Sequence, residues 1–256
     1  MYRPRVIPVI LLDDRGHAVK TQRFGKRIDL GDPVNAVSLF NAFRVDELVL
    51  LDIDASRQQR MTSQTLLADI AGEARMPFSV GGGIRSLEDI RRILSMGAEK
   101  VVLSSVALAR PAFIREAADA FGSSSIVVCI DVKRRFLRGK TVYNSASRRN
   151  ESLGAVEFAR MIEEQGAGEL ILQSVDHDGT MEGYDVELLK SIAEEVSVPV
   201  IALGGAGRIE DLLHLYKETA VSALAAGSLF VFQDSHRGVM INYPDRETLS
   251  RFRGLR

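Results

Sequence analysis

Two glycine runs, VGGGI at residues 80–84 and LGGAG at residues 203–207, are the segments best suited to bind an anion. Each run follows a short apolar stretch and precedes a helical pattern, so its backbone N–H groups can point at a phosphate near a helix N-terminus. One such run alone is most often a tight turn, but two in equivalent places favour binding. We therefore predict two phosphate sites, for a ligand with phosphate at both ends or a nucleotide diphosphate. They consist of Gly82, Gly83, Ser104 and Ser105, and of Gly204, Gly205, Gly227 and Ser228.

Two aspartates follow apolar runs and could perform acid–base chemistry. Asp131 ends the run VVCID, and Asp178 lies beside Gly179 in the segment SVDHDGT at residues 174–180. A carboxylate at the C-terminal end of a strand is well placed to accept or give a proton in an active site. For Asp178 the alternative is a turn, which is common for Asp before Gly, and for Asp131 it is an ion pair with Lys133. We predict that Asp131 is catalytic and that Asp178 and Gly179 belong to the ligand site.

The elements that must position these residues follow a regular alternation. Eight short β-branched runs alternate with amphipathic stretches, which is typical of parallel strands joined by helices. The expected strands cover residues 5–11, 47–53, 78–80, 100–104, 126–131, 169–174, 200–203 and 222–226, and the clearest helices residues 32–43, 87–96, 112–120, 155–165, 186–195 and 209–217. Eight such units predict an α/β fold, a (β/α)8 TIM barrel formed as one domain by residues 1–256. Its active site would lie at the C-terminal ends of the strands.

The two halves of the chain resemble each other. DELVLLDID at residues 46–54 matches GELILQSVD at residues 168–176, and MPFSVGGGI at residues 76–84 matches VPVIALGGA at residues 198–206. The offset is 122 residues in both cases (168 − 46 and 198 − 76). Solenoid repeats have much shorter periods, so the repeat predicts a barrel of two half-barrels. The two glycine runs then lie on opposite sides of the barrel mouth.

The composition excludes several classes of protein. With 33 basic and 34 acidic residues the formal net charge is −1, which disfavours a nucleic-acid partner, and 46% hydrophobic residues exclude disorder. No apolar run approaches the roughly 20 residues of a membrane span, so we expect no membrane partner. A single cysteine, Cys129, allows neither an intramolecular disulfide nor a multi-cysteine zinc site and predicts a cytoplasmic protein. We expect no metal or cofactor, since no ligand spacing relates the histidines, His17, His177, His214 and His236.

Taken together, the motifs resemble those of one known family. RVIP at residues 5–8, VGGGI at 80–84, IDVK at 130–133, DHDGT at 176–180 and GGAG at 204–207 are similar to the cyclase subunit of imidazole glycerol phosphate synthase. The resemblance implies a barrel that forms a heterodimer with a glutaminase subunit and receives ammonia from it. It also implies a bis-phosphorylated aminoimidazole-carboxamide nucleotide as the substrate, and Lys20 as a second catalytic residue.

Charged residues stand at the starts of four of the expected strands: Arg5, Glu47, Lys100 and Glu169. The resemblance implies that they form a ring at the bottom of the barrel, where ammonia enters from the docked glutaminase. Two cations and two carboxylates can neutralise one another, as buried charges require. The alternative is a structural network, because the bottom face of such a barrel usually serves stability. We favour an ammonia gate, and therefore a glutaminase partner.

One position departs from the family. The family pairs the carboxylate after strand five, here Asp131, with another after strand one, where this chain has Leu11. The internal repeat also sets Leu11 against Asp131. Asp13 or Asp14 could replace the missing group only through a different loop path. Without a substitute, the loss of one acid–base partner costs about 10²–10⁴ in rate.

Leu11 and the C-terminal segment, including RGVMINYP at residues 237–244, resemble a branch of the family found with surface-polysaccharide (lipopolysaccharide) genes. In that branch the barrel and its glutaminase supply ammonia to convert an acetamido group on a nucleotide sugar into an acetamidino group. This is our leading interpretation of the sequence. Two alternatives stay open: the cyclase of histidine biosynthesis, with Asp13 or Asp14 as the second carboxylate, and a non-catalytic ammonia conduit.

Overall fold

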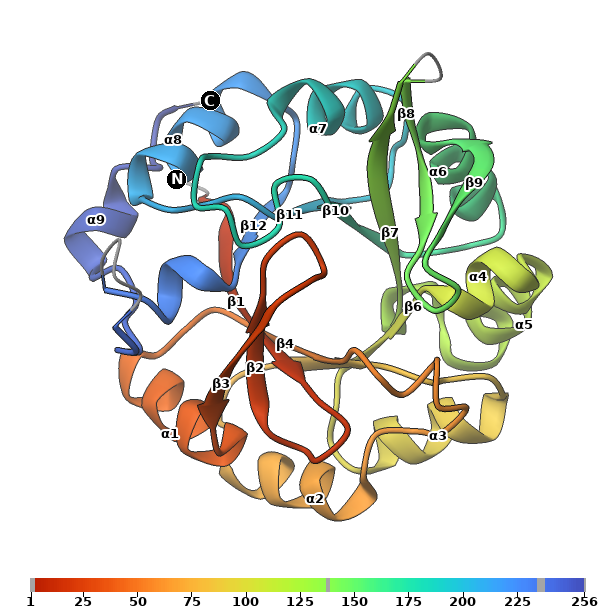
Figure 1. Cartoon of the computed structure of the whole chain (residues 1–256), viewed down its shortest axis with the longest axis horizontal. Coiled ribbons are helices and arrows are strands. Elements are labelled where there is room, and N and C mark those ends of the chain that lie inside the picture. Colours follow the sequence, from red (N-terminus) through yellow and green to blue (C-terminus); the bar gives the residue numbers. More distant parts are fainter. Residues whose placement is uncertain (1–2, 137–138, 234–237, 256) are drawn as a thin grey trace.

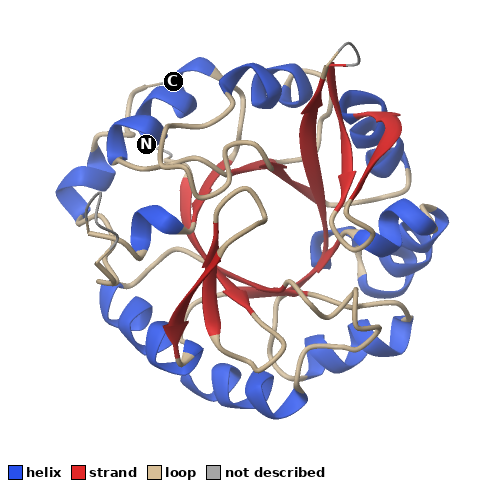
Figure 2. Ribbon diagram, viewed as in Figure 1, coloured by secondary structure: helices blue, strands red, loops and turns tan. Residues whose placement is uncertain are grey.

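Eight parallel strands close into a barrel at the centre of the protein, and helices surround it (Figures 1 and 2). The computed structural model describes residues 3–136, 139–233 and 238–255. The barrel strands, in their order around the barrel, are β1 (Arg5–Leu12), β4 (Leu48–Asp52), β5 (Phe78–Gly81), β6 (Lys100–Leu103), β7 (Ile126–Arg135), β10 (Glu169–Ser174), β11 (Val200–Leu203) and β12 (Ala223–Ala226). Strand β12 pairs with β1, so the sheet has no free edge there. The predicted (β/α)8 TIM barrel is confirmed.

Helices follow the barrel strands and form the outer layer. They are α1 (Pro33–Phe43), α2 (Gln64–Glu73), α3 (Leu87–Ser95), α4 (Ser105–Ala109), α5 (Ala112–Phe121), α6 (Ala155–Glu164), α7 (Val186–Ala193), α8 (Ile209–Glu218) and α9 (Arg246–Ser250). The six helices predicted from periodicity are all present. Helix α2 was missed because it buries only Leu67 and Ile70, which leaves a weak periodic signal. Its cap was visible in the sequence, since the Ser63 hydroxyl accepts the N–H of Leu66.

Two antiparallel hairpins, which the sequence analysis did not predict, extend the barrel at its mouth. Strands β2 (Ala18–Thr21) and β3 (Arg27–Gly31) follow β1, and β8 (Gly139–Asn144) and β9 (Arg149–Gly154) follow β7. Each hairpin thus comes after the first strand of a half-barrel, in keeping with the internal repeat. In Figure 1 the loop between β2 and β3 lies in front of the barrel.

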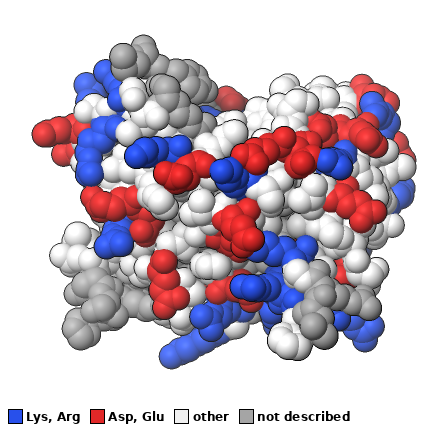
Figure 3. All heavy atoms as spheres, turned by 90° about the horizontal axis from the view of Figure 1, so that it is seen from above, with Lys and Arg blue, Asp and Glu red and all other residues white. Residues whose placement is uncertain are grey.

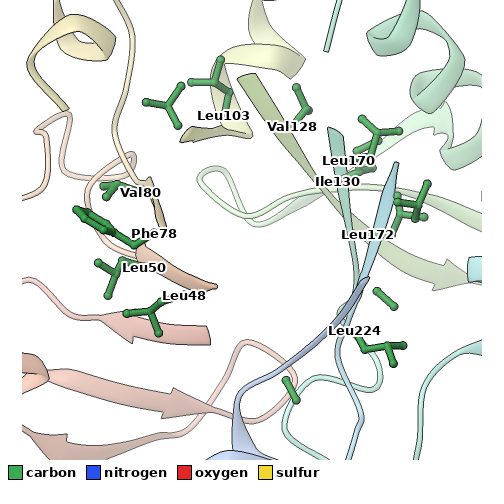
Figure 4. Packing of buried hydrophobic residues seen from close by; sticks show 14 of the residues in the cluster. Leu48, Leu50, Phe78, Val80, Leu103, Val128, Ile130, Leu170, Leu172 and Leu224 are labelled. Atoms are coloured by element: carbon green, nitrogen blue, oxygen red, sulfur yellow. The ribbon is translucent and has the colours of Figure 1, made fainter. Parts of the chain in front are cut away.

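Strand alternation divides the apolar side chains into two groups. Outward-facing residues of the strands pack against the helices, as Figure 4 shows for Leu48 and Leu50 of β4 and Leu170 and Leu172 of β10. Inward-facing residues fill the lumen of the barrel: Ile7, Val9, Leu11, Val49, Val102, Val127, Cys129, Ile171, Ile201, Leu203, Ala223 and Ala225. On the outside, Lys, Arg, Asp and Glu are interspersed over the face seen in Figure 3, consistent with the near-zero net charge.

Phe158→Ala tests the layer between helices and sheet. The Phe158 side chain on α6 is 1% exposed, and its truncation leaves a cavity that we expect to lower the free energy of unfolding by about 3–5 kcal/mol. Phe136→Ala, in the turn after β7, is the matched control because Phe136 is 92% exposed. Urea unfolding of both variants measures the difference. Equal midpoints for the two would contradict the packing described here.

Candidate functional site

Four charged side chains meet at the N-terminal ends of the strands. The guanidinium of Arg5 donates to both Glu47 and Glu169, and Lys100 Nζ lies 3.3 Å from Glu47 Oε1 and 2.8 Å from Glu169 Oε2. The charges alternate around a closed ring, so every cation has two carboxylate neighbours. Burial acts to lower the pKa of Arg5, but the two carboxylates outweigh it and raise that pKa. The structure therefore brings together the four residues of the predicted gate.

Two cavities open at the other end of the barrel. The larger, of about 300 Å³, is lined by one predicted phosphate site, Gly82, Gly83, Ser104 and Ser105, and by Asp131. The smaller, of about 20 Å³, is lined by the other, Gly204, Gly205, Gly227 and Ser228, and by Lys20, Asp178 and Gly179. Leu11, Thr21 and Gln173 line both cavities and therefore lie between the two sites.

The glycine positions cannot accept a side chain. At Gly83, φ is +71° and a Cβ atom would lie 1.7 Å from the carbonyl oxygen of Arg60, and at Gly205, φ is +108° and a Cβ atom would lie 2.0 Å from that of Gly183. Tight packing of backbone on backbone shapes both turns. The N–H of Gly83 already has a partner within the protein, because it donates to the Ser56 hydroxyl at 3.3 Å.

Helix N-termini face the ligand sites beside these glycine turns. Helix α4 begins after Ser104, and the short 3-10 helix η2 (Ser228–Phe230) begins after Gly227. Neither helix has a side-chain cap, and the first N–H groups of a helix have no partner within it, so they can donate to an anion. The N–H of Phe230 in η2 is an exception, because it donates to the carbonyl oxygen of Gly227 at 3.2 Å. Together with the serine hydroxyls, these groups provide donors on both sides of the mouth.

Asp131 lies at the mouth, buried, at the inward-facing position above Cys129 on β7. The Cys129 thiol is 3.7 Å from Asp131 Oδ1. Burial raises the pKa of Asp131 to about 7, with a contribution from the charge of Asp178, while hydrogen bonds from Ser145 and Cys129 oppose the rise. Lys133 makes no ion pair with Asp131; its ammonium lies 5.3 Å from the ring centre of Tyr143. Asp131 is thus poised to exchange a proton near neutral pH.

Lys20 is buried in the smaller cavity. Its ammonium donates to the carbonyl oxygen of Val9 and lies so close to Gly227 that a Cβ atom there would be 2.6 Å from Nζ. Burial lowers the pKa of Lys20 to about 8, although the nearby carboxylate of Asp178 acts to raise it. The site therefore contains a cation that can meet a phosphate or give up a proton.

The carboxylate of Asp178 is occupied by protein donors. It accepts the Thr21 hydroxyl at 2.7 Å, the N–H of Phe24 at 3.3 Å and the Gln173 amide at 3.4 Å. Gly179 packs against the same hairpin, since a Cβ atom there would lie 2.0 Å from the carbonyl oxygen of Thr21. These contacts fasten the β2–β3 hairpin over the mouth. The predicted ligand contacts of Asp178 and Gly179 remain predictions.

Leu11 points into the lumen, 7% exposed, and no carboxylate replaces it from the neighbouring loop. Asp13 holds the turn between β1 and β2, where it accepts the N–H groups of Arg15 and His17, each at 2.9 Å, and the Arg15 guanidinium. Asp14 accepts the amide of Gln58 at 3.1 Å. Neither aspartate is among the residues that line the two mouth cavities.

Two aspartates after β4 were missed as site residues. Asp52 accepts both terminal nitrogens of Arg60, at 2.6 and 3.1 Å, and Asp54 those of Arg27, at 2.5 and 2.8 Å. Both aspartates line the larger cavity. Burial raises the pKa of Asp52, whereas the Arg27 hydrogen bond lowers the pKa of Asp54. The sequence signal that could have identified them as site residues is the motif DID at residues 52–54, at the end of an expected strand.

The histidines form no cluster. His17 lies 3.0 Å from Asp29, and His177 lies 2.9 Å from the Ser174 hydroxyl. His236 and Arg237 lie outside the described residues. Within the described part of the chain, no group of three His, Cys, Asp or Glu residues is arranged to hold a metal ion. In the same part, no helix has the length and apolarity required to span a membrane.

The protein is a TIM barrel with a ring of four charged residues at one end and two cavities at the other. Comparison with known proteins identifies its family. Residues 5–236 match the model of the family described as "Histidine biosynthesis protein". "Putative imidazole glycerol phosphate synthase subunit hisF2" of Pseudomonas aeruginosa is 49% identical over 245 residues, 96% of this chain and 97% of that protein. The "Imidazole glycerol phosphate synthase subunit HisF" of Hydrogenobaculum is 44% identical over 233 residues, 91% of this chain and 92% of that protein. The chain belongs to this histidine-biosynthesis family.

The raised pKa of Asp131 makes stability depend on pH. The unfolded carboxyl titrates near pH 4 and the folded one near pH 7, so between these values the folded state holds a proton that the unfolded state releases. Stability relative to Asp131→Asn should fall by up to about 4 kcal/mol as the pH rises from about 4 to about 8. Urea unfolding at both pH values measures this, with the exposed Asp69→Asn as control. Parallel pH profiles for wild type and Asp131→Asn would contradict the prediction.

Proposed function

We propose that this chain is the ammonia-using barrel subunit of a two-subunit amidotransferase, with a separate glutaminase as its partner. The observation that carries the proposal is the closed ring of Arg5, Glu47, Lys100 and Glu169 at the base of a lumen whose middle is filled by apolar side chains. Ion pairs at the surface would stabilise the base at less cost, because charges inside a barrel lose their hydration. A partner that delivers ammonia at this end gives the ring a function.

The mouth supports a substrate that carries two anionic groups. Two sets of glycine turns, serine hydroxyls and uncapped helix N-termini lie on opposite sides of Leu11, Thr21 and Gln173. A bis-phosphorylated molecule, or a nucleotide diphosphate, can bind one phosphate at each side. Its central part then lies over the lumen, next to Asp131.

Asp131 and Lys20 supply the acid–base groups for this chemistry. With its pKa near 7, Asp131 can remove a proton from the attacking nitrogen and return it to a leaving group at neutral pH. Lys20 is cationic for most of the time at neutral pH and can pair with the phosphate beside Gly227. These roles require no cofactor.

The names of the relatives favour cyclisation as the reaction. The relatives from Pseudomonas and Hydrogenobaculum are named as subunits of imidazole glycerol phosphate synthase, and they match almost the whole barrel. We therefore take the cyclase step of histidine biosynthesis as the first candidate, with a bis-phosphorylated aminoimidazole-carboxamide nucleotide as substrate.

Leu11 favours a second candidate, the amidation of a nucleotide sugar for surface polysaccharide. Cyclisation in the family uses carboxylates on both sides of the mouth, and here an apolar side chain faces Asp131 with no substitute from Asp13 or Asp14. Conversion of an acetamido group into an acetamidino group forms a C–N bond to ammonia and releases the amide oxygen as water, and the part we assign to the barrel in this reaction is the supply of ammonia. The third candidate is a barrel that catalyses no reaction itself and only conducts ammonia to another enzyme.

Growth of a histidine auxotroph distinguishes the two reactions. We expect this chain, expressed with a glutaminase partner in a strain without its own cyclase, to restore growth only weakly, because one acid–base group is absent and the rate falls by about 10²–10⁴. The growth rate is compared with that of the Leu11→Asp variant, which restores the carboxylate. Growth at the normal rate with the unmodified chain would refute the amidation candidate. Absence of growth with both the unmodified chain and Leu11→Asp would refute the cyclase candidate.

Asp131→Asn tests whether the barrel performs chemistry at all. In ammonia-dependent turnover by the assembled complex, we expect the variant to lose about 10²–10⁴ in kcat, since Asn cannot exchange the proton. Asp69→Asn, at an exposed position of α2, is the matched control, and Asp14→Asn is measured beside it. Unchanged turnover in Asp131→Asn would identify the chain as an ammonia conduit, and a loss in Asp14→Asn would give that residue the role of the second carboxylate.

A further inference from the structure

Gln173 is a polar residue at the outlet of the lumen. It lies on β10 two positions beyond Ile171 and four beyond Glu169, so all three side chains face inward, from the charged ring to the mouth. In the parallel pairing of β7 with β10, Gln173 is in register with Asp131. Gln173 is 5% exposed and lines both mouth cavities. It is therefore the immediate neighbour of the predicted catalytic carboxylate.

The orientation of its amide follows from its hydrogen bond. Gln173 Nε2 donates to Asp178 Oδ1 at 3.4 Å, and an ionised carboxylate accepts only from the nitrogen end of an amide. Asp178 is itself held by Thr21 and Phe24. No described residue donates to Gln173 Oε1, and Gln173 lines both mouth cavities, so this acceptor is available for a ligand.

Ammonia that reaches this point has crossed an apolar lumen and needs an acceptor for its N–H groups. Leu11, on the other side, has none. A neutral carbonyl oxygen can hold ammonia without protonating it, whereas a carboxylic acid converts ammonia into ammonium, which has no lone pair for attack. The Gln173 carbonyl therefore suits the uncharged nucleophile, and the ionised form of Asp131 next to it can take the proton released after attack.

We propose that Gln173 is an ammonia-binding residue, whose Oε1 accepts a hydrogen bond from the nucleophile and holds it beside Asp131 under the bound substrate. This inference rests on the proposed ammonia-using function. It adds a binding contact that does not depend on which of the two substrates is correct.

A titration with ammonia alone tests this contact in the full-length chain. The side-chain amide resonances of Gln173 and the carboxyl resonance of Asp131 are followed by NMR as ammonium chloride is added, above and below the pKa of ammonium, with potassium chloride as the salt control. We expect saturable shifts only at the higher pH, where neutral ammonia is present. In Gln173→Met the Asp131 shift should disappear, and in Gln64→Met, at an exposed position, it should persist. Absence of a saturable shift in the wild type would overturn the proposal.

Kinetics with added ammonia provide the second readout, using the bis-phosphorylated nucleotide as substrate. Loss of one hydrogen bond should raise the KM for ammonia by about fivefold to tenfold in Gln173→Met, with the KM for the nucleotide unchanged. Gln173→Asn keeps the amide and should recover part of the effect. An unchanged KM for ammonia in Gln173→Met would overturn the proposal. Ammonia-dependent shifts without turnover would instead refute the cyclase function and leave the binding contact intact.

Discussion

The closed register of the parallel barrel is the constraint on which the site depends. Side chains alternate strictly along each strand, so one register decides which residues enter the lumen. On β1 it turns Arg5, Val9 and Leu11 inward, and on β10 it does the same for Glu169 and Gln173. A shift by one residue on either strand would point these groups at the helices and remove both the ring and the mouth site.

The buried ionisable groups at the two ends of this lumen differ in whether they have a partner of opposite charge. At the base, two cations and two carboxylates lie within hydrogen-bonding distance and neutralise each other. At the mouth, Asp131 has no cation as a partner, and its carboxyl keeps its proton up to about pH 7. In the first arrangement the opposite charges offset their loss of hydration, while the second lowers stability at neutral pH and provides a group that can react. Such a difference is typical of a functional site.

Local sequence patterns predicted the barrel strands and the glycine turns, but not the two hairpins or the hydrogen bonds of Asp178. The eight strands were recognised because each is a short apolar run between turn residues, and the glycine runs because the half-barrel repeat doubles them. The hairpins β2–β3 and β8–β9 were missed because each of their strands has four to six residues with at most two apolar side chains, which gives a weak strand pattern. The hydrogen bonds from Thr21, Phe24 and Gln173 to the Asp178 carboxylate were also not predicted, and Thr21 is 157 residues away from Asp178 in the sequence.

The sequence by itself determined the fold class, the positions of the glycine turns and the presence of Leu11 where the family resemblance leads us to expect a carboxylate, since these are properties of single segments. Only the tertiary structure decided that Arg5 meets Glu169, 164 residues away, and that Gln173 lies beside Asp131 with no described donor to its carbonyl oxygen. The physical reason is the same in each case. A hydrogen bond depends on distance and direction between two groups, and these are set by closure of the barrel, which no single segment of the sequence contains.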